Sequence, residues 1–283
     1  MKRTYTKTLM MLAMICLPVA WAAAQQFQGV ATYQSATKMN LSFSGENKEV
    51  MISEDIKKQL NKQMQKEYVL RFNLTESSYK EAESLDGGPS VAAGGGMVMT
   101  IQAGNNGVLY KNTAEGRYEE EANVFGKPFL VKDELQKYEW QLTGETRKIG
   151  DYNCQKAVYE RVVERRSFKM FSGGDEQEEN SMETVKDTVS IVAWFTPDIP
   201  VSHGPDDYWG LPGLILEVNN GTTTLVCSKL VLNPEEPVKL DMPAKGKVVD
   251  SKEFAELQQA KMEEMMKKYN SGGTRTIRIG SGG

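Results

Sequence analysis

Short runs in which apolar and polar residues alternate make up most of the chain. Residues 27–34 and 214–218 are examples, and their period of two is typical of strands with one buried face. The Asn-Asn-Gly run at 219–221 is a hairpin signal, and 222–232 follows it as the returning strand. Further strands are expected at 68–74, 78–79, 108–110, 117–118, 129–131, 138–142, 145–149, 154–165 and 184–195.

Two segments have helical spacing instead. An internal helix is expected at 53–66, with Ser53 as its N-cap, and a C-terminal helix at 251–269, with Asp250 before it as the cap. Between the strands, 86–107 is rich in glycine and is expected to be a mobile surface excursion. The pattern predicts a mainly β (α+β) fold: one strongly twisted, half-barrel-like antiparallel sheet with an internal and a C-terminal helix.

The first 24 residues have the composition of a secretory signal. Lys2, Arg3 and Lys7 precede a short apolar run, and Ala22 and Ala24 form a cleavage motif. We therefore expect a signal peptide at 1–24 and export of the remainder. Residues 25–283 are expected to form one β-rich domain, with the C-terminal helix and tail at about 250–283.

The net charge of the chain argues against some classes of binding partner. The chain has 34 Lys and Arg against 38 Asp and Glu; without the three basic residues of the signal, the net charge is 31 − 38 = −7. A mildly acidic surface argues against nucleic acids and anionic membranes as partners. The apolar run of the signal is too short for a comfortable membrane span, so no transmembrane segment is expected after cleavage.

After cleavage only Cys154 and Cys227 remain. Both lie in expected strands, and an oxidising compartment favours a disulfide between them. Two free thiols in the core are the main alternative, and a thiol or metal site is a further one.

The segment 204–218 organises the chain. Leu211, Pro212, Gly213 and Leu214 fit a type II turn, with the glycine at the position that needs a positive φ. Aromatic side chains stand just before this turn. We expect the segment to be a structural corner, with a ligand contact as the alternative, and its candidate binding residues are Tyr208, Trp209, Leu211, Pro212 and Gly213.

Residues for catalysis are few. His203 is the single histidine, and no nucleophile motif accompanies it. Asp206, Asp207 and Glu217 are carboxylates that a hydrolase could use, although acids after Gly-Pro usually cap turns. The sequence predicts no cofactor, no metal site and no catalytic residue.

Fifteen methionines leave copper binding open as an alternative. Met97 and Met99, with Met262, Met265 and Met266 on the expected C-terminal helix, have soft thioethers that suit Cu(I). Adaptable packing of an apolar face explains the same residues without a metal.

Several short motifs occur in a fixed order along the chain. They are 78–79, 140–142, 149–157, 193–200 and 204–205, followed by the hexapeptide Gly-Leu-Pro-Gly-Leu-Ile at 210–215. In these motifs and their order the chain resembles the GLPGLI family of secreted Bacteroidetes proteins, which is named for the hexapeptide. The resemblance names no reaction. It implies an exported protein, periplasmic or associated with the outer membrane, that works beside a TonB-dependent or carboxypeptidase-regulatory-domain outer-membrane protein.

These observations favour a non-enzymatic binding or accessory protein of the cell envelope. A curved sheet covered by a helix can leave an apolar concave surface for a lipid-like or peptide ligand. The order of elements is similar to the half-barrel of periplasmic lipoprotein carriers, which is a likeness of fold only.

Overall fold

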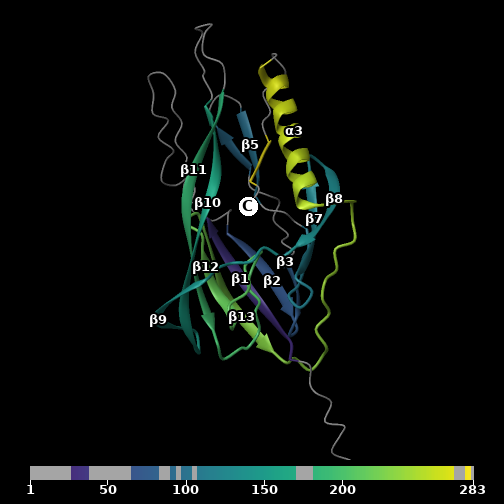
Figure 1. Ribbon diagram of the computed structural model, residues 1–283. Coiled ribbons are helices and arrows are strands. Elements are labelled where there is room, and N and C mark those ends of the chain that lie inside the picture. Colours follow the sequence, from purple (N-terminus) through teal and green to yellow (C-terminus); the bar gives the residue numbers. More distant parts are fainter. Residues whose placement is uncertain are drawn as a thin grey trace, which may run out of the picture.

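The structure, a computed structural model, describes residues 27–37, 65–82, 90–93, 97–103, 107–169, 181–270 and 278–281. Most of them lie in strands of a 12-stranded and a 3-stranded sheet, and one helix is found among them (Figure 1). The predicted mainly β fold is therefore confirmed.

The element bounds in chain order are as follows: β1 (Gly29–Thr37), β2 (Lys66–Phe72), β3 (Glu76–Glu81), β4 (Ser90–Ala93), β5 (Met97–Ala103), β6 (Leu109–Asn112), β7 (Arg117–Val124), β8 (Lys127–Glu134), β9 (Gln141–Ile149), β10 (Tyr152–Lys169), β11 (Ser181–Thr196), β12 (Leu214–Asn219), β13 (Thr223–Leu232), β14 (Lys247–Val249), α3 (Ser251–Asn270) and β15 (Arg278–Ser281).

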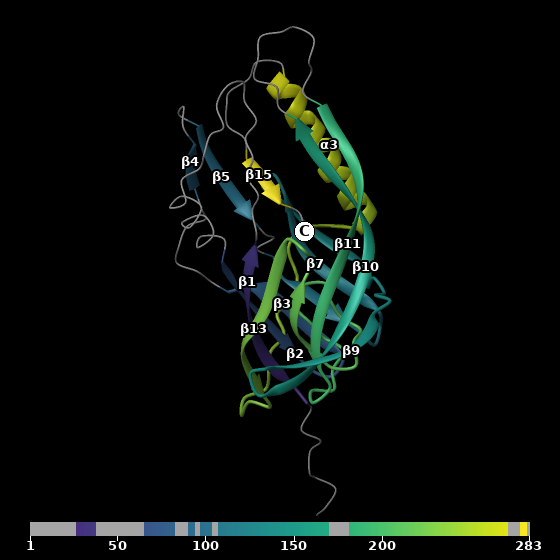
Figure 2. The same cartoon turned by 90° about the vertical axis from the view of Figure 1, so that its left-hand side faces the viewer.

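The large sheet is open. Its strand order is β14-β8-β7-β6-β3-β2-β1-β13-β12-β11-β10-β9, so β14 and β9 are its edges. Its neighbours are antiparallel except β14 and β8. The longest pair is β10 with β11, which run side by side over 155–169 and 181–195 (Figure 2). The half-barrel is not confirmed, because the sheet does not close.

The prediction of a single sheet was wrong. The order β15-β5-β4 forms a second sheet, in which β15 and β5 are parallel. Both β4 and β5 come from the glycine-rich stretch that was predicted to be an excursion. The sequence of β5, Met-Val-Met-Thr-Ile-Gln-Ala, has the β-branched composition of a strand. The glycines around it obscured this signal.

Curvature of the large sheet brings its two halves together around a shared core. One buried cluster joins residues of β1, β2, β3 and β6 to residues of β10 and β12 and to the loop after β11. Its members are Ala31, Tyr33, Leu70, Phe72, Tyr79, Leu109, Cys154, Ile199, Val201, Leu214 and Leu216. The loop therefore lies between the two halves of the sheet.

The C-terminal helix is confirmed as α3. Asp250 caps it, because the backbone N–H of Glu253 donates to the Asp250 carboxylate at 2.7 Å. Phe254 and Leu257 pack against a buried cluster of β7, β8 and β14, and the helix lies beside these strands (Figure 1). The internal helix predicted at 53–66 falls outside the described residues over 53–64, and Lys66 begins β2.

Residues 234–246 cross the sheet between β13 and β14 without regular structure. Asp241 forms ion pairs with Arg71 of β2 at 2.7 Å and with Lys80 of β3 at 3.3 Å. The backbone N–H of Ala244 donates to Glu121 of β7 at 2.9 Å. These contacts guide the chain to β14. No helix in the described part of the chain is long and apolar enough to cross a membrane.

The predicted disulfide is not formed. Cys154 and Cys227 are free thiols, although Cys154 belongs to the shared core and Cys227 packs against it. Cys154 lies on β10 and Cys227 on β13, with β11 and β12 between them. Three sheet spacings of about 4.8 Å each exceed the Cα separation that a disulfide spans. The alternative of two free core thiols describes the structure.

Both thiols should be unreactive in the folded protein. Burial raises the pKa of Cys154 and of Cys227 to about 11, so little thiolate is present at pH 8. Cys16 lies in the expected signal and is replaced by Ser, so that only these two thiols are counted. In this variant, titration with a disulfide reagent at pH 8 should detect almost no thiol before unfolding. Two thiols should react after unfolding in the absence of reductant. If no thiol reacts, Cys154 and Cys227 form a disulfide after all.

Candidate functional site

The loop between β11 and β12, residues 197–213, forms a compact corner, and we call it the corner loop. Its backbone bonds to itself and to β12: Gly210 N donates to Ser202 O and Ile215 N donates to His203 O, both at 3.0 Å. The first and second parts of the loop pack into different hydrophobic clusters. Ile199 and Val201 join the shared core, whereas Tyr208 and Leu211 join a second cluster on β10, β11 and β12.

Lys111 of β6 fastens the corner loop from the opposite half of the sheet. Its side chain is 0% exposed. Its ammonium donates to the carbonyl oxygens of Gly204 at 3.1 Å, Tyr208 at 3.2 Å and Asp206. Burial lowers the pKa of Lys111. Three carbonyl acceptors match the three protons of an ammonium group, so the geometry fits the charged form.

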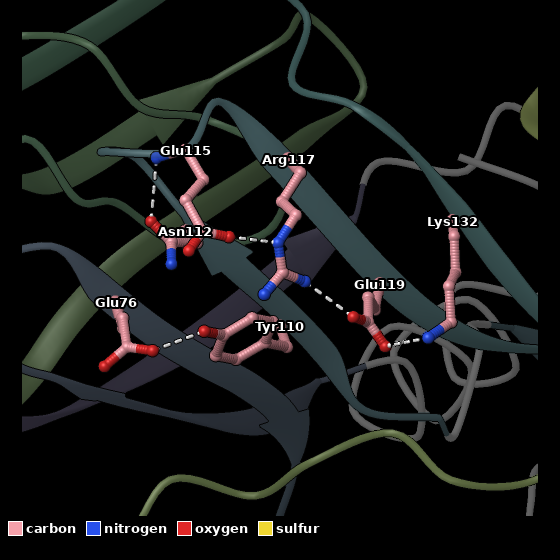
Figure 3. Close-up of polar contacts among 7 residues, drawn as sticks. All are labelled: Glu76, Tyr110, Asn112, Glu115, Arg117, Glu119 and Lys132. Carbon is pink, nitrogen blue, oxygen red and sulfur yellow. Dashed lines mark hydrogen bonds and ion pairs between the residues drawn. The ribbon is translucent and has the colours of Figure 1, made fainter.

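The opposite face of β6 carries a network of charged and polar contacts that runs from β3 to β8 (Figure 3). Tyr110 donates to Glu76 at 2.5 Å, and Arg117 lies over the Tyr110 ring and pairs with Glu119 at 2.6 Å. Lys132 of β8 binds the second oxygen of Glu119 at 2.8 Å. This network holds β6 between its neighbours and so fixes the strand from which Lys111 projects.

His203 is a buried structural residue. It is 0% exposed, and its Nε2 bonds to the Asn73 carbonyl at 3.0 Å. The carbonyl can only accept, so Nε2 carries the proton and Nδ1 is left without a partner in the described structure. Burial, followed by the nearby Lys111 charge, lowers the pKa of His203 to about 3. A neutral, enclosed imidazole is poorly placed to act as a general base on a substrate.

Aromatic rings gather where the corner loop meets β10 and the chain leading into β9. Tyr138 stacks on Trp140 with ring centroids 5.4 Å apart, and Tyr159 lies edge-on to both. The indoles tie this chain to the loop: Trp140 donates to the Trp209 carbonyl and Trp209 donates to the Gln136 carbonyl, each at 2.8 Å. Tyr138, Trp140 and Tyr159 are partly exposed, and we call these three residues the aromatic face.

Carboxylates of the corner loop lie next to the aromatic face. Asp207 accepts a hydrogen bond from the Tyr138 hydroxyl at 2.6 Å. Asp206 adopts a left-handed φ of 53°. Its side chain is exposed, and the partial loss of water around it, followed by the Asp207 charge, raises the pKa of Asp206. Both acids thus flank the loop carbonyls that accept hydrogen bonds from Lys111.

The predicted binding residues lie together but differ in role. Tyr208 and Leu211 are buried, Trp209 is partly exposed and Pro212 is exposed. Gly213 is needed for close approach, because a Cβ there would lie 2.1 Å from the Thr196 carbonyl oxygen. The predicted type II turn was wrong, since Gly210 rather than Gly213 has the positive φ, 93°. The segment lies in the loop between β11 and β12, and its role as a structural corner rather than a ligand contact stays a prediction.

Other candidates have structural partners. Glu217 pairs with Arg147 of β9. Met97 and Met99 lie in β5, where only the backbone is described. Among the described residues, no group of three or more His, Cys, Asp or Glu side chains is arranged to hold a metal ion.

Sequence reasoning missed Lys111 and also Arg161, a partly exposed residue of β10 next to the aromatic face. A lysine in a short strand usually points to solvent, so pattern alone gave Lys111 no special role. Alternation did offer one signal for Arg161, because it follows Ala157 and Tyr159 at steps of two and therefore shares their face.

Residues 140–217, from Trp140 to Glu217, match the model of a family described as "Protein of unknown function (Porph_ging)". The chain resembles that family over this segment. The finding fits a Bacteroidetes-associated family of unknown function, as expected, but it does not single out the GLPGLI name. The matched segment contains β9 to β11 and the corner loop, and it includes most of the candidate site.

Two solved structures of PNGF-II are also similar, at 16% identity with TM-scores of 0.46 and 0.45. The matches cover 82% of this chain and 33% of the other, so the chain spans about a third of the PNGF-II length. None of the curated proteins compared with the chain matches it.

Replacing Lys111 by methionine should destabilise the protein. Methionine fills similar space but leaves the three carbonyls that bound the ammonium without a donor, and a buried unsatisfied group costs roughly 1–3 kcal/mol. We expect a loss near the upper end of that range in urea unfolding. Lys127→Met, at an exposed position of β8, is the matched control and should be neutral. Equal stability of the two variants would contradict the anchoring role.

His203 should make stability depend on pH. Its pKa is about 3 when folded and near 6.5 when unfolded, so between these values the unfolded chain binds one more proton. Stability is therefore lost as pH falls through this window, by up to about 1.4 kcal/mol per pH unit.

The His203→Gln variant isolates this effect, because the chain has no other histidine. Asp206, whose pKa is raised, has the opposite slope, but it is present in both proteins and cancels in their difference. Urea midpoints measured from pH 7 to pH 4.5 should converge as pH falls. Parallel curves would show that His203 does not remain neutral in the folded state.

Proposed function

We propose that the protein is an exported component of the cell envelope that binds a lipid-like or peptide ligand without converting it. The aromatic face carries this proposal. It presents three partly exposed rings beside Leu142, which is 57% exposed. Leu142 pairs with Ala157 of β10, so it continues the same side of the strands. Planar rings next to an exposed leucine offer the apolar contact area that such ligands need.

A binding role also agrees with how the chain uses its reactive groups. His203 and Lys111 are enclosed and hydrogen-bonded within the protein, and Asp207 and Glu217 bind Tyr138 and Arg147. Each of these side chains supports the corner loop or the strands around it. This arrangement favours a scaffold that presents a surface over one that carries out a reaction.

Location and partners belong to the same proposal. The signal at 1–24 supports export to the periplasm or to the inner side of the outer membrane, as one domain from residue 25. An outer-membrane protein of the TonB-dependent or carboxypeptidase-regulatory-domain type is the proposed alternative partner. No specific contact in the described structure favours copper binding or hydrolysis.

Native mass spectrometry of protein purified from its own periplasm tests the proposal. We expect a polypeptide that begins near Gln25, with an additional non-covalent mass that collisional activation removes. The same sample under denaturing conditions provides the mass of the bare chain. A chain that retains Met1 would refute export, and a ligand-free chain that also fails to bind added amphiphiles would refute the binding role.

A further inference from the structure

Arg161 lies on β10 at the end of the aromatic face. Leu142 is paired with Ala157, and one step of two residues along, the rings of Trp140 and Tyr159 are 5.9 Å apart. Two residues further along β10, Arg161 shares the side of the strand that carries Tyr159. Its partner on β11 is Val189, which packs against the same buried cluster as the aromatic face.

The Nε of the Arg161 guanidinium has no hydrogen-bond partner among the described residues. This Nε is buried, and no ion pair of Arg161 is found within the described residues. Other arginines differ: Arg71 pairs with Asp241, Arg117 with Glu119 and Arg147 with Glu217. A buried donor without an acceptor is unfavourable, so a native arginine in this state calls for an explanation.

Asp207 is the acid that could have formed an ion pair with Arg161. Instead it accepts the Tyr138 hydroxyl, and it forms no ion pair with Arg161. Arg161 nevertheless acts on the same ring system, because its charge lowers the pKa of Tyr138 and of Tyr208 against the larger effect of burial. The free donors of Arg161 are therefore close to the rings that we propose as the ligand surface.

We propose that Arg161 binds a carboxylate of the ligand while the aromatic face and Leu142 hold its apolar part. The inference rests on the proposed function and names the chemical class of the ligand. A guanidinium presents a planar fork of N–H donors that matches the two oxygens of a carboxylate. A fatty acid and the C-terminus of a peptide share this group, and both combine it with apolar surface.

Calorimetric titration of the full chain with decanoate and with decanol tests the charge, since the two differ only in the carboxylate. A second pair tests the source: an N-acetylated apolar tripeptide with a free C-terminus and the same peptide as its amide. Wild type should bind decanoate, the free peptide or both at least about tenfold more tightly than the uncharged counterpart.

Arg161→Gln should remove this preference and leave binding of decanol or the amide unchanged. Arg161→Lys, which keeps the charge but not the fork, should retain part of it. Arg147→Gln, on β9 but paired with Glu217, is the matched control and should bind like wild type. Asp207→Asn should strengthen carboxylate binding, because it removes a like charge near Arg161.

The outcomes separate the two proposals. Carboxylate binding that is unaffected in Arg161→Gln and Arg161→Lys overturns the inference and leaves the binding function standing. Equal affinity of wild type for the charged and the uncharged member of both pairs also overturns the inference alone. Failure of all four probes to bind wild type overturns the inference and counts against the binding function. Melting curves show whether each variant is folded. If Arg161→Gln does not fold, the carboxylate preference of Arg161→Lys is the test of the inference.

Discussion

The fold depends on one buried ammonium group. Lys111 reaches across the curved sheet and binds three carbonyls of the corner loop, so the two halves are joined by polar bonds as well as by apolar packing. A lysine without water is costly unless all its protons are bonded, and here the loop supplies the acceptors. The left-handed residue Asp206 is part of this arrangement, since its carbonyl is one of the three.

This constraint explains why the corner loop can serve two cores at once. Its first part completes the shared core, while Tyr208 and Leu211 complete the cluster beneath the aromatic face. The position of the aromatic face is therefore set by the loop through two hydrogen bonds, from Trp140 to the Trp209 carbonyl and from Trp209 to the Gln136 carbonyl. A surface held in this way is organised in advance, which would reduce the entropy cost of binding the proposed ligand.

Local sequence patterns correctly predicted the elements that are determined by residues close together in the chain. The Asn-Asn-Gly turn, the returning strand and the capped C-terminal helix follow from residues within a few positions of one another. The type II turn failed because the glycine at 213 is required by the Thr196 backbone, which no local pattern reveals. Lys111 and the loop carbonyls are more than 90 residues apart, and Cys154 and Cys227 are separated by strands whose order the sequence does not encode locally. The corner was thus visible from the sequence, whereas what holds it in place was not.

Strand order also bears on how the chain reaches this structure. β1, near the N-terminal end, is paired on one side with β2 and on the other with β13, whose residues lie almost two hundred positions later. Until β13 is available, one edge of β1 has no partner, and pairings of such long separation form slowly. One edge of the N-terminal half of the sheet therefore stays unpaired until nearly the whole chain has been synthesised. The large sheet can therefore be completed only after β13 has been synthesised.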